Sequence, residues 1–162
     1  RYHAFSNKTL HLNRQNFQPS LNIAIECNEH QTIMNKIYIE TSIGDLLDKI
    51  TILEIKMNKI KDKDSLNEIN KEYSSLQETL KKDVNTNEEI LTLVKELKKT
   101  NLSLWDIEDK LRVSEKNKKF DQNFISLARS VYINNDNRAK IKLKINQLSG
   151  SNIKEIKGYS DY

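Results

Sequence analysis

Apolar residues recur every three or four positions from Ser42 onward, which is the spacing of one face of an α-helix. Two shorter runs of this kind cover 43–61 and 65–82. Two longer runs cover 88–116 and 122–148, and no proline interrupts any of them. The pattern therefore predicts four main helices, of which the last two are the longest.

Helix-capping residues stand at the ends of these runs: Ser42 with Asp45, Thr86 with Glu89, Asp121, and Gly150. At 1.5 Å per residue each longer helix measures about 40 Å, so the shorter pair can cover only part of the longer pair. We expect an all-α fold, an antiparallel bundle of four main helices with an irregular N-terminal arm.

The first 33 residues lack this periodicity and hold the only proline, the only cysteine and all three histidines. We expect 1–33 to be an arm or the end of a preceding domain, 34–150 the bundle, and 151–162 a loosely held tail. The bundle should fold without the arm, because every apolar seam begins after Met34. Alternating apolar residues at 21–25 and 37–39 predict a short two-stranded ribbon.

Composition narrows the class of protein. The chain has 162 residues, 36% hydrophobic and 31% charged, with three glycines and one proline, which does not favour an all-β fold. The single Cys27 excludes an internal disulfide, and no apolar stretch approaches the roughly 18 residues of a membrane span. We expect a cytoplasmic protein. Acidic and basic residues are interspersed despite a net charge of +4, so we expect no nucleic-acid partner.

Familiar catalytic and metal-binding motifs are absent. The histidines, His3, His11 and His30, are scattered, and no two stand at the spacing of a helical zinc site. Three isolated glycines cannot form a phosphate-binding loop. We expect no metal and no cofactor, and we favour a protein without catalysis of its own.

Polar residues interrupt the apolar seams of the two long helices at one level. With a turn near 119–120, antiparallel pairing places Glu108 opposite 131–132 and Asn101 opposite 138–139. The candidate site residues at this level are Asn101, Trp105, Glu108, Asp109, Arg112, Tyr132, Asn135 and Arg138, together with Glu54 at the edge of the first seam.

Two interpretations of this level remain open. A pocket could hold a small anionic ligand on Arg112 and Arg138. Alternatively, a buried layer of ion pairs fixes the register of the helices, with Glu108 next to Arg138, and we favour this interpretation. Asp48 and Lys49 are expected to face solvent, as charged residues on helices usually do.

Three blocks of the sequence resemble a family of small bacterial helical proteins of unknown function. These are IETSIGDLLDKITILEIK at 39–56, NLSLWDIED at 101–109, and the stretch 124–142, notably LARSVY and NDNRA. The likeness covers about 34–158. It implies a compact helical module and no particular reaction, and it favours a site at the polar level because those residues lie within the recurring blocks.

The segment 7–25, with RQNF leading into LNIAI, resembles the last strand and helix of a heptosyltransferase-type glycosyltransferase or of a repeat protein fused to one. That resemblance implies a module accessory to a sugar-transfer enzyme. We therefore expect a protein-interaction or scaffolding module that binds a partner protein or a second copy through apolar residues on its first two helices. The alternative is an anion-binding or catalytic bundle.

Overall fold

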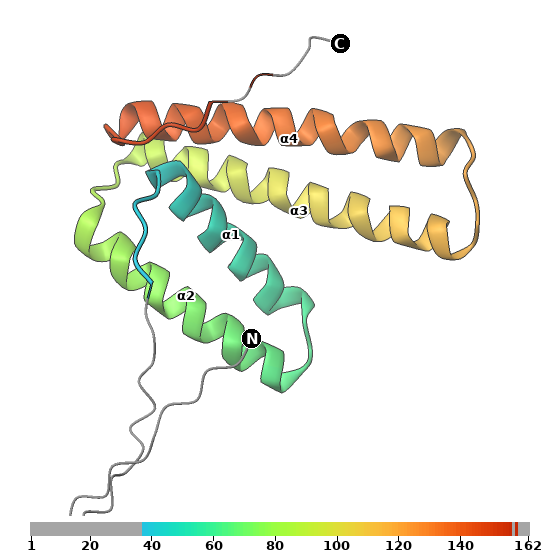
Figure 1. Cartoon of the computed structure of the whole chain (residues 1–162), viewed down its shortest axis with the longest axis horizontal. Coiled ribbons are helices and arrows are strands. Elements are labelled where there is room, and N and C mark those ends of the chain that lie inside the picture. The colour runs from blue at the N-terminus through green and yellow to red at the C-terminus, as the bar shows by residue number, and fades with distance from the viewer. Residues whose placement is uncertain (1–36, 157, 159–162) are drawn as a thin grey trace, which may run out of the picture. The chain divides into compact units, whose positions relative to one another are not determined.

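The structure is a computed structural model that describes residues 37–156 and 158. It contains four α-helices, α1 (Ile43–Lys59), α2 (Lys63–Asp83), α3 (Glu88–Lys116) and α4 (Gln122–Leu148), shown in Figure 1. No strand occurs in this part of the chain. The all-α prediction is confirmed, and each predicted helix boundary lies within two residues of the observed one.

Side chains cap the first turn of each helix. Ser42 Oγ accepts a hydrogen bond from the Asp45 N–H, and Asp121 caps α4 as predicted. For α3 the cap is Asn87 rather than the predicted Thr86, because Asn87 Oδ1 accepts from the Ile90 N–H at 2.8 Å. Gly150 follows α4 with a φ of 66°, a left-handed conformation that glycine adopts without strain.

The second strand of the predicted two-stranded ribbon, at 37–39, is not present in the structure. Residues 37–42 have no regular secondary structure, and Ile37 and Ile39 are more than four-fifths exposed. The proposed first strand, 21–25, lies outside the described residues.

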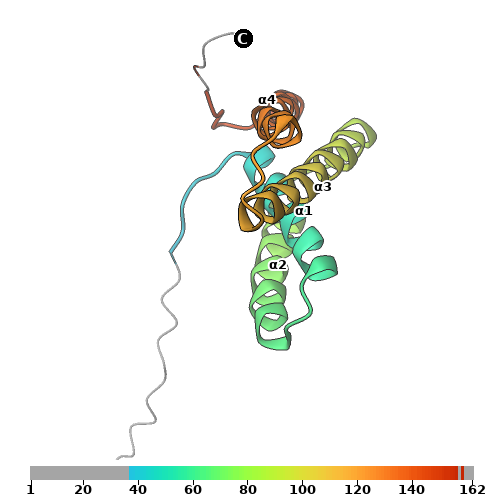
Figure 2. The ribbon, with the colours of Figure 1, turned by 90° about the vertical axis from the view of Figure 1, so that its right-hand side faces the viewer.

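The helices form two hairpins that cross. The antiparallel α3–α4 hairpin is the longer, and α1 packs against α3, α4 and α2. Figures 1 and 2 show that α1 begins beside α4 and runs diagonally away from it, with α2 on its far side. The bundle is therefore centred on α1, the helix that contacts all three others.

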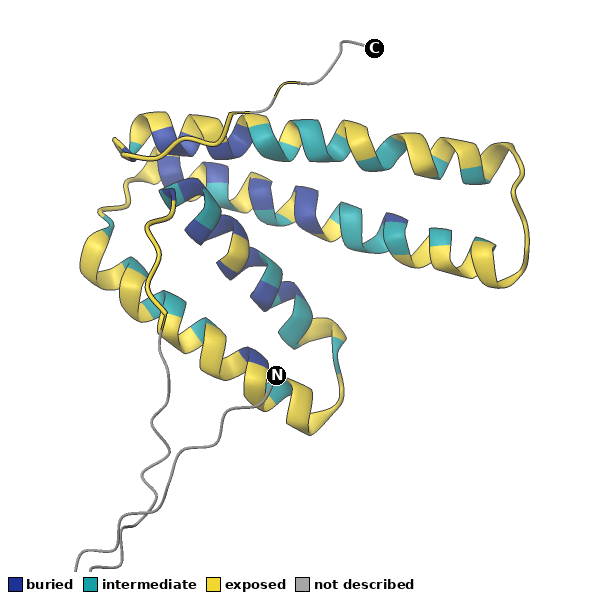
Figure 3. Cartoon of the chain, in the orientation of Figure 1, coloured by how far each residue is buried: buried dark blue, intermediate teal, exposed yellow. Residues whose placement is uncertain are grey.

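The apolar core lies at one end of the α3–α4 hairpin. Its main cluster consists of Leu47, Ile90, Leu93, Leu97, Ile141 and Ile145. We call the covered part, 88–107 with 135–148, the proximal half of the hairpin, and 108–134 the distal half. No residue between Ile107 and Ile141 is buried, as the colouring in Figure 3 shows. Of the helices described, none is long and apolar enough to cross a membrane.

Candidate functional site

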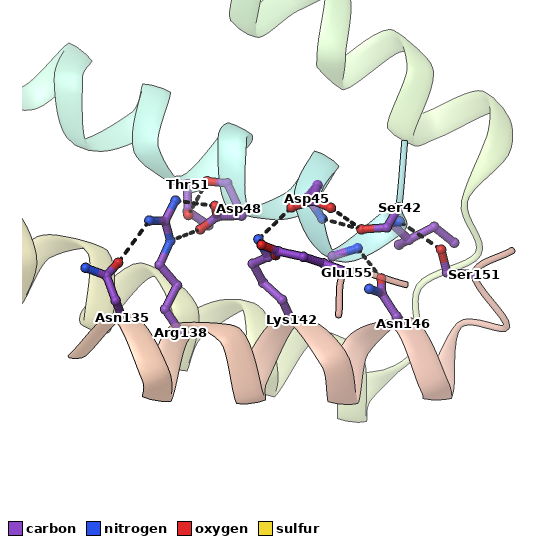
Figure 4. Close-up of polar contacts among 12 residues, drawn as sticks. Ser42, Asp45, Asp48, Thr51, Asn135, Arg138, Lys142, Asn146, Ser151 and Glu155 are labelled. Carbon is purple, nitrogen blue, oxygen red and sulfur yellow. Dashed lines mark hydrogen bonds and ion pairs between the residues drawn. The ribbon is translucent and has the colours of Figure 1, made fainter. Parts of the chain in front are cut away.

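An ion pair joins α1 to α4 just beyond the core. Arg138 Nε donates to Asp48 Oδ1 at 2.9 Å, and a second guanidinium nitrogen donates to Oδ2, so the contact is bidentate (Figure 4). Asp48 is only 5% exposed. Because a buried carboxylate is costly without a partner, Arg138 is what allows Asp48 to lie inside the protein.

Helix α3 completes this arrangement. The Asn101 amide nitrogen donates to Asp48 Oδ1 at 2.8 Å and to Thr51 Oγ1 at 2.9 Å. Thr51 in turn donates to the backbone carbonyl of Asp48. We call Asp48, Thr51, Asn101 and Arg138 the polar layer. It connects three helices, and among the residues described no buried side-chain nitrogen or oxygen lacks a partner.

The polar layer neutralises the positive charge of Arg138. The hydrogen bonds that Arg138 donates to Asp48 raise the pKa of Arg138, against the opposing effect of burial. The carboxylate that pairs with Arg138 is therefore Asp48, not the predicted Glu108, whose side chain is 47% exposed and lies 3.6 Å from Arg112. This geometry favours the structural interpretation of the layer, with a different acidic partner.

The prediction that Asp48 faces solvent is wrong, and the reason is the central position of α1. Because α1 packs against three helices, its solvent-facing strip is narrow, and Asp48 lies outside it. Lys49 does lie on that strip, where its exposed side chain pairs with Glu72 at 2.6 Å.

A second ion-pair cluster lies one turn further along α4. Lys142 Nζ lies 2.6 Å from Asp45 Oδ1 and 2.7 Å from Glu155 Oε2, and its side chain is 10% exposed. Burial lowers the pKa of Lys142, but the bonds to both carboxylates outweigh it and the net shift is upward. Burial raises the pKa of Asp45, because it disfavours the charged carboxylate. The hydrogen bonds that Asp45 accepts from Lys142 and Ser42 outweigh this effect, so the pKa of Asp45 is lower than its ordinary value.

The first turn of α1 is bound by the end of α4 and the segment after it. The Gly44 N–H donates to Asn146 Oδ1 at 2.6 Å, and the Ile43 N–H donates to Ser151 Oγ at 3.2 Å. A Cβ at Gly44 would stand 2.7 Å from the Lys142 carbonyl oxygen. Glycine is therefore required for this close approach.

The sequence pattern did not predict four members of the site: Asp48, Thr51, Lys142 and Asn146. One signal was available: Arg138, Lys142 and Asn146 step by four, so they share one face of a helix with polar side chains. That face is the one that meets α1.

Beyond the polar layer, the divergence of α1 from α4 leaves an open groove of about 510 Å³. Its lining residues are Ile52, Ile55, Asn101, Leu104, Trp105, Glu108, Asp109, Arg112, Asn135 and Arg138. The sequence predicted that the candidate residues lie at one level along the two long helices. All but two of them line this groove.

The two exceptions are Glu54 and Tyr132. Glu54 binds Lys98 at 2.7 Å and accepts a hydrogen bond from the Tyr73 hydroxyl at 3.3 Å, on the α2 side of α1. Burial, followed by the charge of Glu54, raises the pKa of Tyr73. Tyr132 is 37% exposed and is not part of the groove lining.

Among the residues that the structure describes, no group of three or more histidine, cysteine, aspartate or glutamate side chains could hold a metal ion.

A family model described as a family of unknown function, DUF6165, matches residues 36–162. No curated protein and no solved structure matches the chain.

Proposed function

Because the chain belongs to the DUF6165 family, whose function is unknown, we propose a function from the geometry: a protein-interaction module that binds its partner along the outer face of α4. One observation carries the proposal. An apolar stripe follows α4 on a face that no other described helix covers.

The stripe consists of Ile125, Ala128, Tyr132, Ala139 and Leu143, which follow one another by three, four, seven and four residues. Its three large side chains are 47%, 37% and 40% exposed, in chain order. Such spacing is typical of a helix seam that packs against another helix. We call it the α4 stripe; it extends over about 27 Å.

The location differs from the one expected. The large apolar side chains that are exposed lie on α3, on α4 and in segments outside the helices, and none of those described lies on α1 or α2. The reason is that α1 is covered on most sides and the apolar residues of α2 face α1.

The stripe is nearly symmetric about residue 134, and this symmetry favours a second copy of the chain as partner. In an antiparallel α4–α4 pair, Ile125 lies opposite Leu143 of the other copy, and Ala128 lies opposite Ala139. Twofold symmetry makes such contacts occur twice, which is what a self-complementary interface needs.

Charge on the edge of the stripe supports the same pairing. Arg129 and Asp136 are seven residues apart, so they occupy the same position relative to the stripe. In the antiparallel pair about residue 134, Arg129 of each copy stands level with Ala139 of the other, three residues from Asp136, which a long arginine side chain can reach. Opposite charges on the same edge favour an antiparallel orientation of the two copies, while the apolar pairs set the register.

The polar layer supports an interaction module rather than the alternative of an anion site. Arg138 already binds a carboxylate through two nitrogens, so its charge is not available to a second anion. The sugar-transfer context predicted from 1–33 rests on residues outside the described part of the chain, and the proposal does not depend on it.

The test is the oligomeric state of the full chain and of two matched variants, measured by sedimentation between about 1 and about 100 µM. We expect a dimer that Ile125→Lys with Leu143→Lys converts to a monomer. Val113→Lys is the control, since Val113 is 58% exposed on α3 and outside the stripe.

A photo-crosslinking residue at position 132 distinguishes the kinds of partner in living cells. A self-adduct supports the antiparallel pair. An adduct with one other protein, lost in the Ile125→Lys, Leu143→Lys variant, supports an interaction module with a different partner. A monomeric chain that forms no adduct at 132 contradicts the proposal.

A further inference from the structure

We propose that the groove between α1, α3 and α4 binds a small organic cation, namely an amine or guanidine group carried on an apolar or aromatic body. The inference rests on the groove alone and is independent of the α4 stripe.

The groove is built by the crossing of the hairpins. α1 runs in the same direction as α3, since Asn101 meets Asp48 while Asp106 meets Lys59 further along. α1 runs against α4 and leaves it after the Asp48–Arg138 contact. The polar layer thus closes the inner end of the groove, and its volume of about 510 Å³ lies in the range of small-molecule sites.

Four apolar side chains line the groove and offer contacts to the body of a ligand. They are Ile52 and Ile55 from α1, and Leu104 and Trp105 from α3. Trp105 is the only tryptophan of the chain. The face of an indole ring attracts cations through its quadrupole, more strongly than phenylalanine or tyrosine does.

The charge of the groove favours a cation. Its two positive side chains are matched by carboxylates, Arg138 by the buried Asp48 and Arg112 by Glu108 at 3.6 Å. Asp109 also lines the groove and forms no ion pair with any residue that the structure describes. The sum over these five charged groups is one negative charge, which an anionic ligand would meet and a cationic ligand would neutralise.

The two amides of the groove differ in what they leave for a ligand, because Asn135 already accepts a hydrogen bond from Arg138 through its Oδ1 at 3.4 Å. Asn101 uses its amide nitrogen for Asp48 and Thr51, so the atom it can offer a ligand is its carbonyl oxygen. An acceptor matches the N–H groups of an amine or guanidine. Together with Asp109 and Trp105, it completes a set of groups that recognise a positively charged donor.

The fluorescence of Trp105 reports on this site without any label. We would titrate the full chain with 2-phenylethylamine and, in parallel, with 3-phenylpropionate, which has a similar body and the opposite charge. The amine should give a saturable change with a midpoint of about 1 mM, as expected for a ligand of this size. The carboxylate should need at least a tenfold higher concentration.

Variants assign the effect to the groove. Asp109→Asn should weaken amine binding by about twofold to fivefold, the loss expected for one solvent-accessible ion pair. Glu115→Gln removes the same charge from α3 outside the groove lining and should leave the midpoint unchanged. The Ile125→Lys, Leu143→Lys background keeps the measurement independent of oligomeric state.

The indole N–H resonance of Trp105 in a ¹H–¹⁵N spectrum provides a second readout, so binding that is silent in fluorescence is still detected. The proposal is overturned if neither readout changes at about 10 mM amine, a concentration well above the expected midpoint. Equal midpoints for amine and carboxylate, or a midpoint that Asp109→Asn leaves unchanged, overturn it as well.

Discussion

The two halves of the α3–α4 hairpin are made from the same two helices, yet they differ in what surrounds them. In the proximal half, Leu97 and Ile145 are completely buried. In the distal half no residue is buried, and Val113, Phe120 and Ile125 are about half exposed. The difference is α1, which covers one half and diverges from the other (Figure 1).

The distal half therefore depends on the mutual packing of α3 and α4 and on local interactions. Asp121 caps α4, and Lys118 pairs with Glu115 beside the turn. Phe120 packs edge-on against Phe124, with the ring centroids 5.2 Å apart. Each of these contributes about 1 kcal/mol or less. Tertiary burial is concentrated in the proximal half, so most of the stability that comes from burial is gained at one end of the hairpin.

The sharpest test of this division is to remove the buried carboxylate. Asp48→Leu should lower the free energy of unfolding by about 3 to 5 kcal/mol, because Arg138 loses its counterion inside the protein. Urea denaturation measures this. Glu108→Leu removes the half-exposed carboxylate that the sequence predicted as the partner of Arg138. This change should alter the free energy of unfolding by less than about 0.5 kcal/mol.

The double variant Asp48→Leu with Arg138→Leu should recover much of that loss, since no unpaired charge remains. If Asp48→Leu and Glu108→Leu prove equally costly, the polar layer does not distinguish the halves.

Apolar truncation gives the next largest contrast. Leu97→Ala removes a completely buried side chain and should cost about 3 kcal/mol. Leu111→Ala, in the half-exposed distal half, should cost about 1 kcal/mol. Thermal melting of the two variants compares them directly, and a larger loss at Leu111 would mean that a partner covers the distal half in solution.

The close approach at the start of α1 predicts a somewhat smaller effect. Gly44→Ala places a methyl group 2.7 Å from a backbone oxygen and should cost about 2 kcal/mol, despite the better helix propensity of alanine. Gly150→Ala meets no atom within 4 Å and should cost only about 1 kcal/mol from its positive φ. Equal urea midpoints for the two variants would show that α1 can shift to make room.

The smallest effect is a pH dependence. Because the pKa of Asp45 is lower in the folded chain, its contribution is present above the unfolded value of about 3.9 and is lost as pH falls through the folded value. Lys142 has a raised pKa, so its contribution is lost only in strongly alkaline solution. Asp45 is partly exposed, so Asp45→Asn should remove less than about 1 kcal/mol of the acid dependence between pH 5 and pH 3. Urea denaturation at each pH measures this contribution, and Glu108→Gln in the distal half serves as the control.

The sequence was sufficient to predict the helices because their signals are local. Apolar spacing and capping side chains such as Ser42 and Asp121 act within a few residues, and these determine where each helix begins and ends. The antiparallel pairing of α3 and α4 followed from the short turn between them.

The partner of Arg138 could not be predicted in the same way. Helical phase tells which residues of α4 face inward, but not which helix of the other hairpin meets them. Asp48 lies ninety residues away in sequence, and only the crossing of α1 over α3 and α4 brings it to Arg138. The level of the groove was therefore predictable from α3 and α4, while its buried acidic partner was not.

The first turn of α1 also carries a consequence for how the chain is made. Its backbone N–H groups at Ile43 and Gly44 are bound by Ser151 and Asn146, which follow them by 108 and 102 residues. A ribosome that has just released α1 and α2 has not yet synthesised either partner. The hairpin that begins the domain must therefore wait, incompletely capped, until the end of α4 emerges, and the domain can complete its fold only as its last helix leaves the exit tunnel.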